Sequence, residues 1–191
     1  MGRVKTDLTI DAKGLACPMP ILRTRMAINE INPGEVLEVQ ATDKGSKADI
    51  QAWSKSSGHH YLGTVEENGV LTHYIRKASK DEETVETEYP HVVTNEELAA
   101  KLESNEEVLI VDVREPAEFA FGHIPSAVSM PLGELEERAA ELGGNHTIYV
   151  ICRTGNRSDA ASRILSEKGI ANVWNVKPGM SLWNGPVEGE N

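Results

Sequence analysis

Residues 149–158 read Tyr-Val-Ile-Cys-Arg-Thr-Gly-Asn-Arg-Ser, and they place a cysteine between a predicted strand and a predicted helix. The apolar, β-branched run at residues 148–151 is typical of a buried strand, and residues 158–168 carry apolar side chains at helical spacing. Cys152 is therefore expected in a strand-to-helix turn. Backbone N–H groups can converge in such a turn, and the helix adds the positive end of its dipole. The loop thus predicts an anion-binding site around the cysteine sulfur.

The surroundings of Cys152 favour a reactive thiol. Arg153 follows it directly and Arg157 closes the loop. Such a thiol should ionise at a lower pH than free cysteine, and the thiolate is the nucleophilic form. The alternative is a buried structural cysteine, because cysteine often behaves as a small core residue. Two arginines and a glycine within five residues argue against an apolar site, so we interpret Cys152 as catalytic.

The loop resembles the six-residue active-site loop of single-domain rhodanese sulfurtransferases, with four residues between Cys152 and Arg157. Related phosphatases and arsenate reductases place five residues there, which makes a wider cradle for a tetrahedral oxyanion. Loop size thus favours sulfane sulfur over phosphate. The resemblance implies that the loop binds substrate through Arg153, Thr154, Gly155, Asn156, Arg157 and Ser158.

The rhodanese resemblance extends over residues 91–187. Its secondary signatures are Asp112-Val113-Arg114-Glu115, His123-Ile124-Pro125 with Ala127, and Gly179-Met180-Ser181-Leu182-Trp183. Pro178 departs from the pattern, because a second glycine commonly stands there. We expect Asp112 and Arg114 to form a structural ion pair near the site, His123 to pack within its turn, and Trp183 to line the core or the pocket rim.

The first part of the chain predicts an independent small domain. Strands are expected at residues 6–11, 36–41, 61–66 and 70–76, and helices at 21–31 and 47–57. Asn68-Gly69 is a strong hairpin signal, because both turn positions need a positive φ. The order β-α-β-α-β-β implies a two-layer α/β sandwich, with two helices on one face of a four-stranded mixed sheet.

Cys17 is the second cysteine of interest, at the start of the first predicted helix. Taken alone, Cys17-Pro18-Met19-Pro20 fits a helix-cap cysteine without chemistry as well as a functional thiol. The segment from Gly14 to Pro20, together with Pro33-Gly34-Glu35 and Ala41-Thr42-Asp43, resembles the TusA/SirA-like sulfur carriers over residues 5–77. Lys13 stands where that family often has arginine. The resemblance implies that Cys17 accepts sulfur as a persulfide and hands it on, and we expect it, like Cys152, to be anionic.

The second part predicts a three-layer α/β/α domain of the rhodanese type. Strands are expected at residues 108–113, 148–151 and 173–176, and helices at 96–102 with Asn95 as cap, 116–121, 132–142 and 158–168. Alternating strands and helices imply a mostly parallel sheet covered on both faces. The Cys152 loop then lies at the carboxyl end of a strand, where such sheets bind ligands.

Length and charge suggest two domains joined by a linker. The 191 residues divide into a carrier domain at 1–77, an acidic linker at 78–90 and a rhodanese domain at 91–191. The linker can reach about 45 Å when extended, so it would hold each cysteine at about millimolar concentration relative to the other.

Composition excludes several functions. The net charge of −11 disfavours binding to nucleic acid, and no apolar run is long enough to cross a membrane. The first residues do not form a signal peptide, so a cytoplasmic location is expected. In that compartment we expect no structural disulfide between the two cysteines. His59-His60 lacks further ligands at metal spacing, and we expect no metal and no cofactor.

The sequence therefore predicts a rhodanese-type sulfurtransferase of the thiosulfate class. Sulfane sulfur from thiosulfate or a low-molecular-weight persulfide would pass as a cysteine persulfide between Cys152 and Cys17, in either direction, and on to an acceptor thiol or sulfur-relay protein. One alternative is a non-catalytic persulfide or redox sensor or scaffold. Another is a thiolate phosphatase or arsenate reductase, which leaves the Cys17 motif unexplained.

Overall fold

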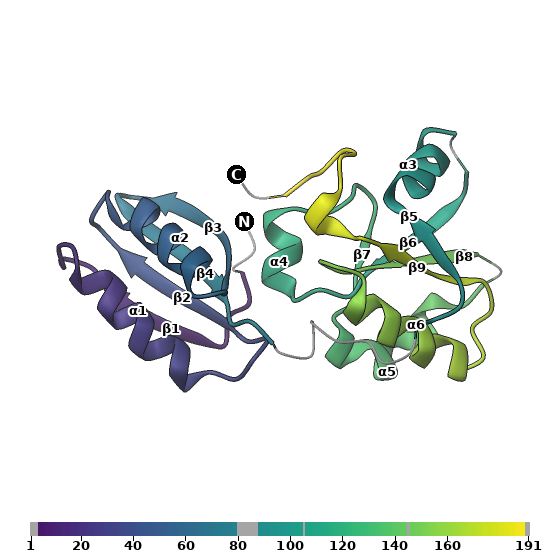
Figure 1. The fold of residues 1–191 in the computed structure, drawn as a ribbon, viewed down its shortest axis with the longest axis horizontal. Coiled ribbons are helices and arrows are strands. Elements are labelled where there is room, and N and C mark those ends of the chain that lie inside the picture. The colour runs from purple at the N-terminus through teal and green to yellow at the C-terminus, as the bar shows by residue number, and fades with distance from the viewer. Residues whose placement is uncertain (1–3, 80–87, 105, 145, 190–191) are drawn as a thin grey trace. The chain divides into compact units, whose positions relative to one another are not determined.

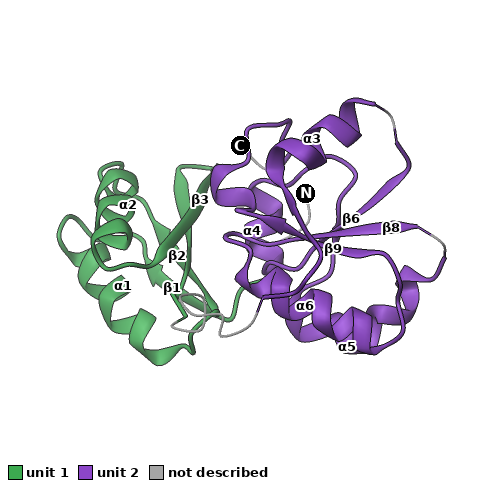
Figure 2. Cartoon of the chain, turned by 45° about the vertical axis from the view of Figure 1, so that its right-hand side comes forward, with its two compact units in different colours: residues 1–80, 190–191 green, residues 81–189 purple. Residues whose placement is uncertain are grey.

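The chain forms two compact units, residues 1–80 and residues 81–189 (Figure 2), and each is described by itself. The structure is a computed structural model that describes residues 4–79, 88–104, 106–144 and 146–189. Unit 1 has a hydrophobic core around Leu37, Ile50 and Ile75. Unit 2 has two hydrophobic clusters of its own, one that includes Val150 and Leu165 and one that includes Ile110.

Unit 1 is the predicted two-layer sandwich. Its elements are β1 (Leu8–Ala12), α1 (Met19–Glu30), β2 (Val36–Ala41), α2 (Ser46–Ser56), β3 (His60–Glu67) and β4 (Val70–Arg76). The sheet has the order β1-β2-β4-β3, with β1 and β2 parallel and the other pairs antiparallel. Both helices cover one face of it (Figure 1). Asn68 and Gly69 turn the β3–β4 hairpin with φ values of 52° and 78°, as predicted.

Unit 2 is built on a five-stranded sheet in the order β5-β9-β8-β6-β7, in which every pair is parallel. Its strands are β5 (Val92–Thr94), β6 (Val108–Asp112), β7 (Val128–Ser129), β8 (Thr147–Ile151) and β9 (Val173–Lys177). Its α-helices are α3 (Asn95–Glu103), α4 (Pro116–Phe121), α5 (Leu135–Arg138) and α6 (Asn156–Glu167). In Figure 1, α5 and α6 lie on one side of the sheet and α3 on the other, so the three layers are confirmed.

Two local predictions in unit 2 are wrong. The helix expected at 132–142 is divided into a 3₁₀ turn at Leu132–Glu134, the short α5, and a second 3₁₀ turn at Ala139–Leu142. Thr94, rather than Asn95, caps α3, because its hydroxyl accepts from the N–H of Glu97 while the Glu97 carboxylate accepts from the N–H of Thr94. The side chain of Asn95 is therefore available for another contact.

The linker predicted at residues 78–90 lies largely outside the described residues, which stop at 79 and resume at 88. Its last part packs on unit 2, where Tyr89 is buried in a hydrophobic cluster. The N–H of Tyr89 donates to Asp159 Oδ1 at 2.7 Å, and Lys177 Nζ lies 2.8 Å from Glu88 Oε1. Residues 88 and 89 are thus fixed close to the start of α6.

Candidate functional site

Cys152 lies in the turn between β8 and α6, as predicted. Gly155 precedes the first residue of α6 with a φ of 98°, and a Cβ there would clash with Cγ of Lys177 at 2.6 Å. Only glycine therefore fits this turn. The turn directs the N–H of Gly155 to the Cys152 sulfur at 3.1 Å, and the Ser158 hydroxyl lies 3.3 Å from the same atom. The sulfur thus has a polar environment at the carboxyl end of a central strand.

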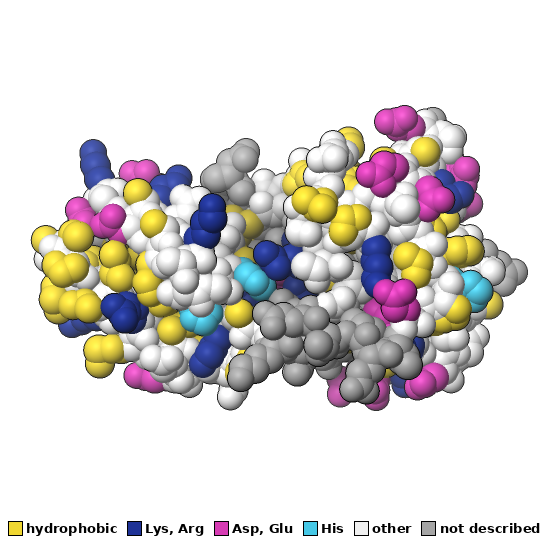
Figure 3. All heavy atoms as spheres, viewed as in Figure 1, with side chains coloured by type: hydrophobic (Ala, Val, Ile, Leu, Met, Phe, Trp, Pro, Cys, Tyr) yellow, Lys and Arg dark blue, Asp and Glu magenta, His cyan; other side chains and the backbone are white. Residues whose placement is uncertain are grey.

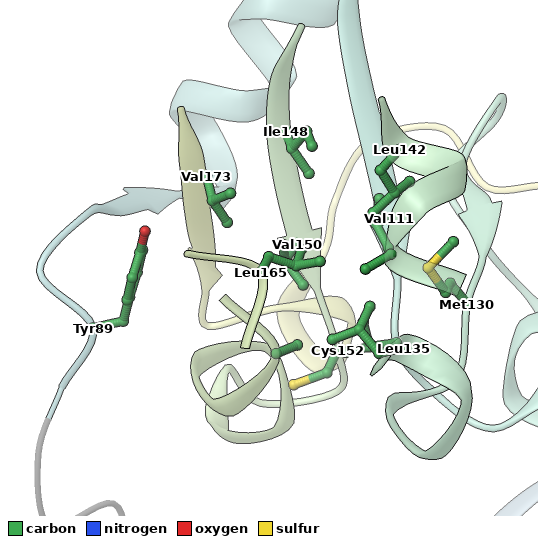
Figure 4. Packing of buried hydrophobic residues seen from close by; sticks show 13 residues of the cluster. Tyr89, Val111, Met130, Leu135, Leu142, Ile148, Val150, Cys152, Leu165 and Val173 are labelled. Atoms are coloured by element: carbon green, nitrogen blue, oxygen red, sulfur yellow. The ribbon is translucent and has the colours of Figure 1, made fainter. Parts of the chain in front are cut away.

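Cys152 is also deeply buried, with 1% of its surface exposed. Figure 4 shows it in the hydrophobic cluster that includes Val150 and Leu135. Burial is what a structural cysteine would show, but the contacts of its sulfur with Gly155 and Ser158 are not those of an apolar site. The loop residues above it, among them Arg153 and Thr154, are only half-buried. The sulfur therefore forms the floor of a loop with a more open rim.

The rim offers groups that can bind an anion. Within the described part of the chain, the Arg153 guanidinium makes no hydrogen bond or ion pair. The backbone N–H groups of Arg153, Thr154 and Ser158 likewise find no acceptor among the described residues. Unpaired amides at a helix N-terminus, next to a cation, are suited to hold a negatively charged ligand.

Arg157 is held by a residue that the sequence did not indicate. Its Nη1 and Nη2 atoms lie 2.7 and 2.9 Å from the two carboxylate oxygens of Glu118 on α4, and both side chains are largely buried. Glu118 also accepts from the N–H of Glu115. A bidentate pair of this kind fixes the plane of the guanidinium. Glu118 thus anchors the end of the loop to α4. It was missed because a glutamate in the first turn of a helix resembles an ordinary capping residue.

A second loop supports the Cys152 loop from β9. The N–H groups of Met180 and Ser181 donate to the carbonyls of Cys152 and Arg153, each at 2.9 Å. Asn95 fixes this support, since its side-chain amide exchanges two hydrogen bonds with the backbone of Gly179. The signature segment at residues 179–183 therefore lies against the loop and holds its backbone.

The other signature residues behave as predicted. Asp112 and Arg114 form a buried ion pair with a shortest distance of 2.6 Å, and Arg114 also donates to the Gly122 carbonyl. His123 stacks on Phe119 with ring centroids 3.7 Å apart. Trp183 packs partly buried against the core. These residues stabilise the framework of the site.

Cys17 is exposed and precedes α1 in unit 1. The nearby carboxylate of Asp49, which can accept from the thiol, raises the pKa of Cys17, with smaller effects from desolvation and from the charges of Asp49 and Asp43. The expectation that Cys17 is anionic at rest is therefore wrong. Its acidic neighbours favour the neutral thiol.

The helix that follows Cys17 presents apolar side chains to solvent. Met19, Leu22 and Met26 are exposed and share one face of α1, and yellow side chains gather there in Figure 3. In the described residues, no group of three His, Cys, Asp or Glu side chains could hold a metal ion, and no helix among them is long and apolar enough to cross a membrane.

Comparison with known proteins finds one family for the first part of the chain and another for the second. Residues 8–77 match the family model for the sulfurtransferase TusA, and residues 94–186 match that for the rhodanese-like domain. The Bacillus subtilis protein described as "Putative sulfur carrier protein YrkF" is 46% identical over 185 residues, which cover 97% of this chain and all of that protein. The chain belongs to the TusA–rhodanese fusion family. It is accordingly a protein of the sulfur-carrier and sulfurtransferase class.

Other relatives of the TusA–rhodanese chain match one unit. The protein described as "Putative sulfurtransferase YtwF" of B. subtilis is 38% identical over 94 residues, 49% of this chain and 90% of that protein. The solved rhodanese-like domain of Alr3790 from Anabaena has a TM-score of 0.50 at 30% identity, covering 53% of this chain and 81% of that one. A rhodanese-like domain protein from Staphylococcus aureus also has a TM-score of 0.50, at 32% identity, covering 53% and 99%. The fold of unit 2 is thus that of rhodanese-like proteins.

Proposed function

We propose that this TusA–rhodanese chain relays sulfane sulfur as a cysteine persulfide between a small donor, Cys152 and Cys17. In this proposal residues 1–77 are the carrier, 78–90 the connection and 91–191 the sulfurtransferase. The observation that carries it is the hydrogen bond from the Gly155 amide to the Cys152 sulfur, at the base of a loop whose Arg153 has no partner among the described residues. A thiolate in this position is stabilised by the loop and faces a cation that attracts anionic donors.

The first half-reaction loads Cys152. Its thiolate bonds to the outer sulfur of thiosulfate, the S–S bond of thiosulfate breaks, and sulfite leaves with the bonding electrons. With a low-molecular-weight persulfide, a small thiolate leaves instead. The negative outer sulfur of the new persulfide is held by the loop N–H groups of residues 153–158, while Arg157, fixed by Glu118, maintains the loop.

The second half-reaction transfers the sulfur to an acceptor thiol. The Cys17 thiol loses its proton, attacks the outer sulfur of the Cys152 persulfide, and Cys152 leaves as a thiolate. We infer that Asp49 receives that proton, because its carboxylate is the main cause of the raised pKa of the thiol. The relay can run the other way when an outside donor loads Cys17 first, and a sulfur-relay protein is the final acceptor or donor.

Intact-mass spectrometry of the full chain after incubation with thiosulfate tests the proposal. We expect a gain of about 32 Da, one sulfur atom, for the wild type and for Cys17→Ser. Cys152→Ser should take up little sulfur from thiosulfate, although its Cys17 is intact. Equal loading of Cys17 in Cys152→Ser would contradict the proposed order.

A persulfide or redox sensor is the second candidate, because the contacts of the Cys152 sulfur with Gly155 and Ser158 would stabilise a modified sulfur as well as a catalytic one. The two functions differ in turnover. A relay consumes thiosulfate continuously when a thiol or cyanide acceptor is supplied, whereas a sensor is modified once and stops. Absence of turnover in the full chain, with stoichiometric modification of Cys152, would replace the relay by the sensor.

A further inference from the structure

Ser158 lies between two acceptors but has one hydrogen to donate. Its Oγ is 2.6 Å from Asn175 Oδ1 and 3.3 Å from the Cys152 sulfur, and both polar side chains are fully buried. A serine hydroxyl donates one hydrogen bond and can accept others. Only one of the two neighbours can therefore receive the Ser158 hydrogen at a time.

The orientation of Asn175 decides which neighbour receives it. The Nδ2 of Asn175 donates to the Gly155 carbonyl at 3.1 Å. The opposite orientation would place Oδ1 against that carbonyl, acceptor against acceptor. The Gly155 carbonyl would keep the N–H of Asp159 as a donor, but Asn175 Oδ1 would be buried without one. Asn175 therefore presents an acceptor to Ser158, and the short distance of 2.6 Å assigns the hydrogen to this bond.

The assignment affects the states of Cys152 differently. In the neutral thiol, the S–H can donate to Ser158 Oγ, so every group has a partner. In the thiolate, the sulfur still accepts the hydrogen bond from the Gly155 N–H. The Ser158 hydrogen stays on Asn175 Oδ1, unless Asn175 turns and gives up its bond to the Gly155 carbonyl. In the persulfide, the charge has moved to the outer sulfur, and the inner sulfur no longer requires a strong donor.

We propose that Asn175 is a positioning residue that withholds the Ser158 hydrogen from the Cys152 thiolate. The unloaded thiolate is then short of one donor, and this deficit disappears when it accepts sulfur. A thiolate with fewer hydrogen bonds is more basic and more nucleophilic. Asn175 thereby favours attack on the donor. The inference rests on the proposed function, in which Cys152 is the sulfur acceptor.

A double-mutant cycle separates this role from simple support of the loop. All four proteins are full chains that carry Cys17→Ser. The first has no further change, the second adds Asn175→Leu, the third adds Ser158→Ala, and the fourth adds both. Because Cys17→Ser leaves one cysteine, the ultraviolet absorbance of the thiolate reports Cys152 alone at pH values below those at which tyrosine ionises. The rate of persulfide formation from thiosulfate is measured on the same four proteins by intact mass.

In the protein that keeps Ser158, Asn175→Leu should lower the midpoint of the Cys152 titration by about one pH unit. The Ser158 hydroxyl then has no amide acceptor and donates to the sulfur instead. The rate constant of the thiolate with thiosulfate should fall about threefold, as a less basic thiolate is a weaker nucleophile. With Ser158→Ala, the same change at Asn175 should move the midpoint little, since no hydrogen is left to redirect.

Loss of the Asn175–Gly155 hydrogen bond loosens the loop in both backgrounds, so it cannot produce this difference. Equal midpoint shifts in the two backgrounds, or no shift with Ser158 present, would overturn the proposal. Asn175→Asp is a second variant of the same shape. It keeps and strengthens the acceptor for Ser158, so it should raise the midpoint, and a lowered midpoint would also overturn the proposal.

Failure of the proposed function gives a different result. If none of the four proteins gains sulfur from thiosulfate or a small persulfide, Cys152 is not the acceptor and the relay is wrong. The titration midpoints still decide whether Asn175 controls the Ser158 hydrogen.

Discussion

Glu118 is the residue on which the position of Arg157 depends. Its substitution by alanine leaves a largely buried guanidinium without its bidentate partner. We expect Glu118→Ala to destabilise unit 2 by about 3 to 5 kcal/mol and to slow sulfur loading of Cys152. Chemical denaturation of the full chain and intact mass measure the two effects. Glu136→Ala, at an exposed position of α5, is the matched control and should change stability by less than about 0.5 kcal/mol.

Gly179 is required because the supporting loop touches the backbone of Cys152. Its φ is 84°, and a Cβ there would overlap the Cys152 carbonyl and lie 3.0 Å from the Arg153 carbonyl. Gly169 is a control with a similar φ of 81° and no atom within 4 Å of the added Cβ. Gly169→Ala should cost about 1 to 2 kcal/mol from backbone strain alone. Gly179→Ala should cost more and abolish loading, and equal effects in denaturation and mass measurements would refute the role of close packing.

Contacts between site residues that are close in the sequence could be predicted, whereas contacts between residues far apart in the sequence could not. Asp112 and Arg114 were predicted to pair, since they are two positions apart at the end of a strand. Glu118 and Arg157 are 39 positions apart, and nothing in either local sequence specifies the partner. Asn175 was likewise unseen, because a polar residue in a parallel strand gives no sign of whether it faces a nucleophile.

At the level of elements, the strongly periodic segments were predicted and the irregular ones were not. The strand before Cys152, the helix after it and the Asn68-Gly69 hairpin follow from local side-chain pattern and turn chemistry. β5 and β7 have three and two residues, too short to give a pattern. The 132–142 segment has helical spacing, but the structure divides it into a short α-helix between two 3₁₀ turns.

The packing of α2 against β3 and β4 buries a histidine that makes unit 1 sensitive to acid. His73 on β4 bonds Ser46 of α2 at 2.9 Å and Thr64 of β3 at 2.7 Å. Desolvation lowers the pKa of His73 from 6.5 to about 4, with a smaller effect from Lys47. Between these values the unfolded chain binds a proton that the folded chain does not. The contribution of His73 to the stability of unit 1 is therefore complete above pH 6.5. It is lost as pH falls toward 4, by about 3 kcal/mol at most.

Hydrogen exchange of β4 and α2 in the full chain, corrected for intrinsic rates, measures this loss between pH 7 and pH 4.5. His73→Gln is the control, because glutamine can accept and donate in the same place but does not titrate in this range. Carboxylates titrate in both proteins, so the difference between them isolates His73. A pH dependence that is the same in both proteins would show that the histidine is not responsible.

At the scale of the whole molecule, we expect the covalent connection between the units to set the rate of the proposed relay. Each cysteine belongs to a unit with its own core, so transfer requires the two to meet. Tethering provides an effective concentration of about 1 mM. Transfer from loaded Cys152 to Cys17 within one chain should therefore be first order and independent of protein concentration. Peptide mass mapping of quenched samples at several concentrations measures it.

Transfer between chains is the matched comparison. Loaded Cys17→Ser can give sulfur only to another molecule, and isotope-labelled Cys152→Ser offers Cys17 as the acceptor. At about 10 μM of each, this transfer should be roughly 100-fold slower than transfer within the wild-type chain, which is the ratio of the two concentrations. Because both variants keep the whole chain, the folding of each unit is unchanged in the comparison. Equal rates at this concentration, or a wild-type rate that rises in proportion to protein concentration, would show that the carrier and the sulfurtransferase of one chain do not serve each other.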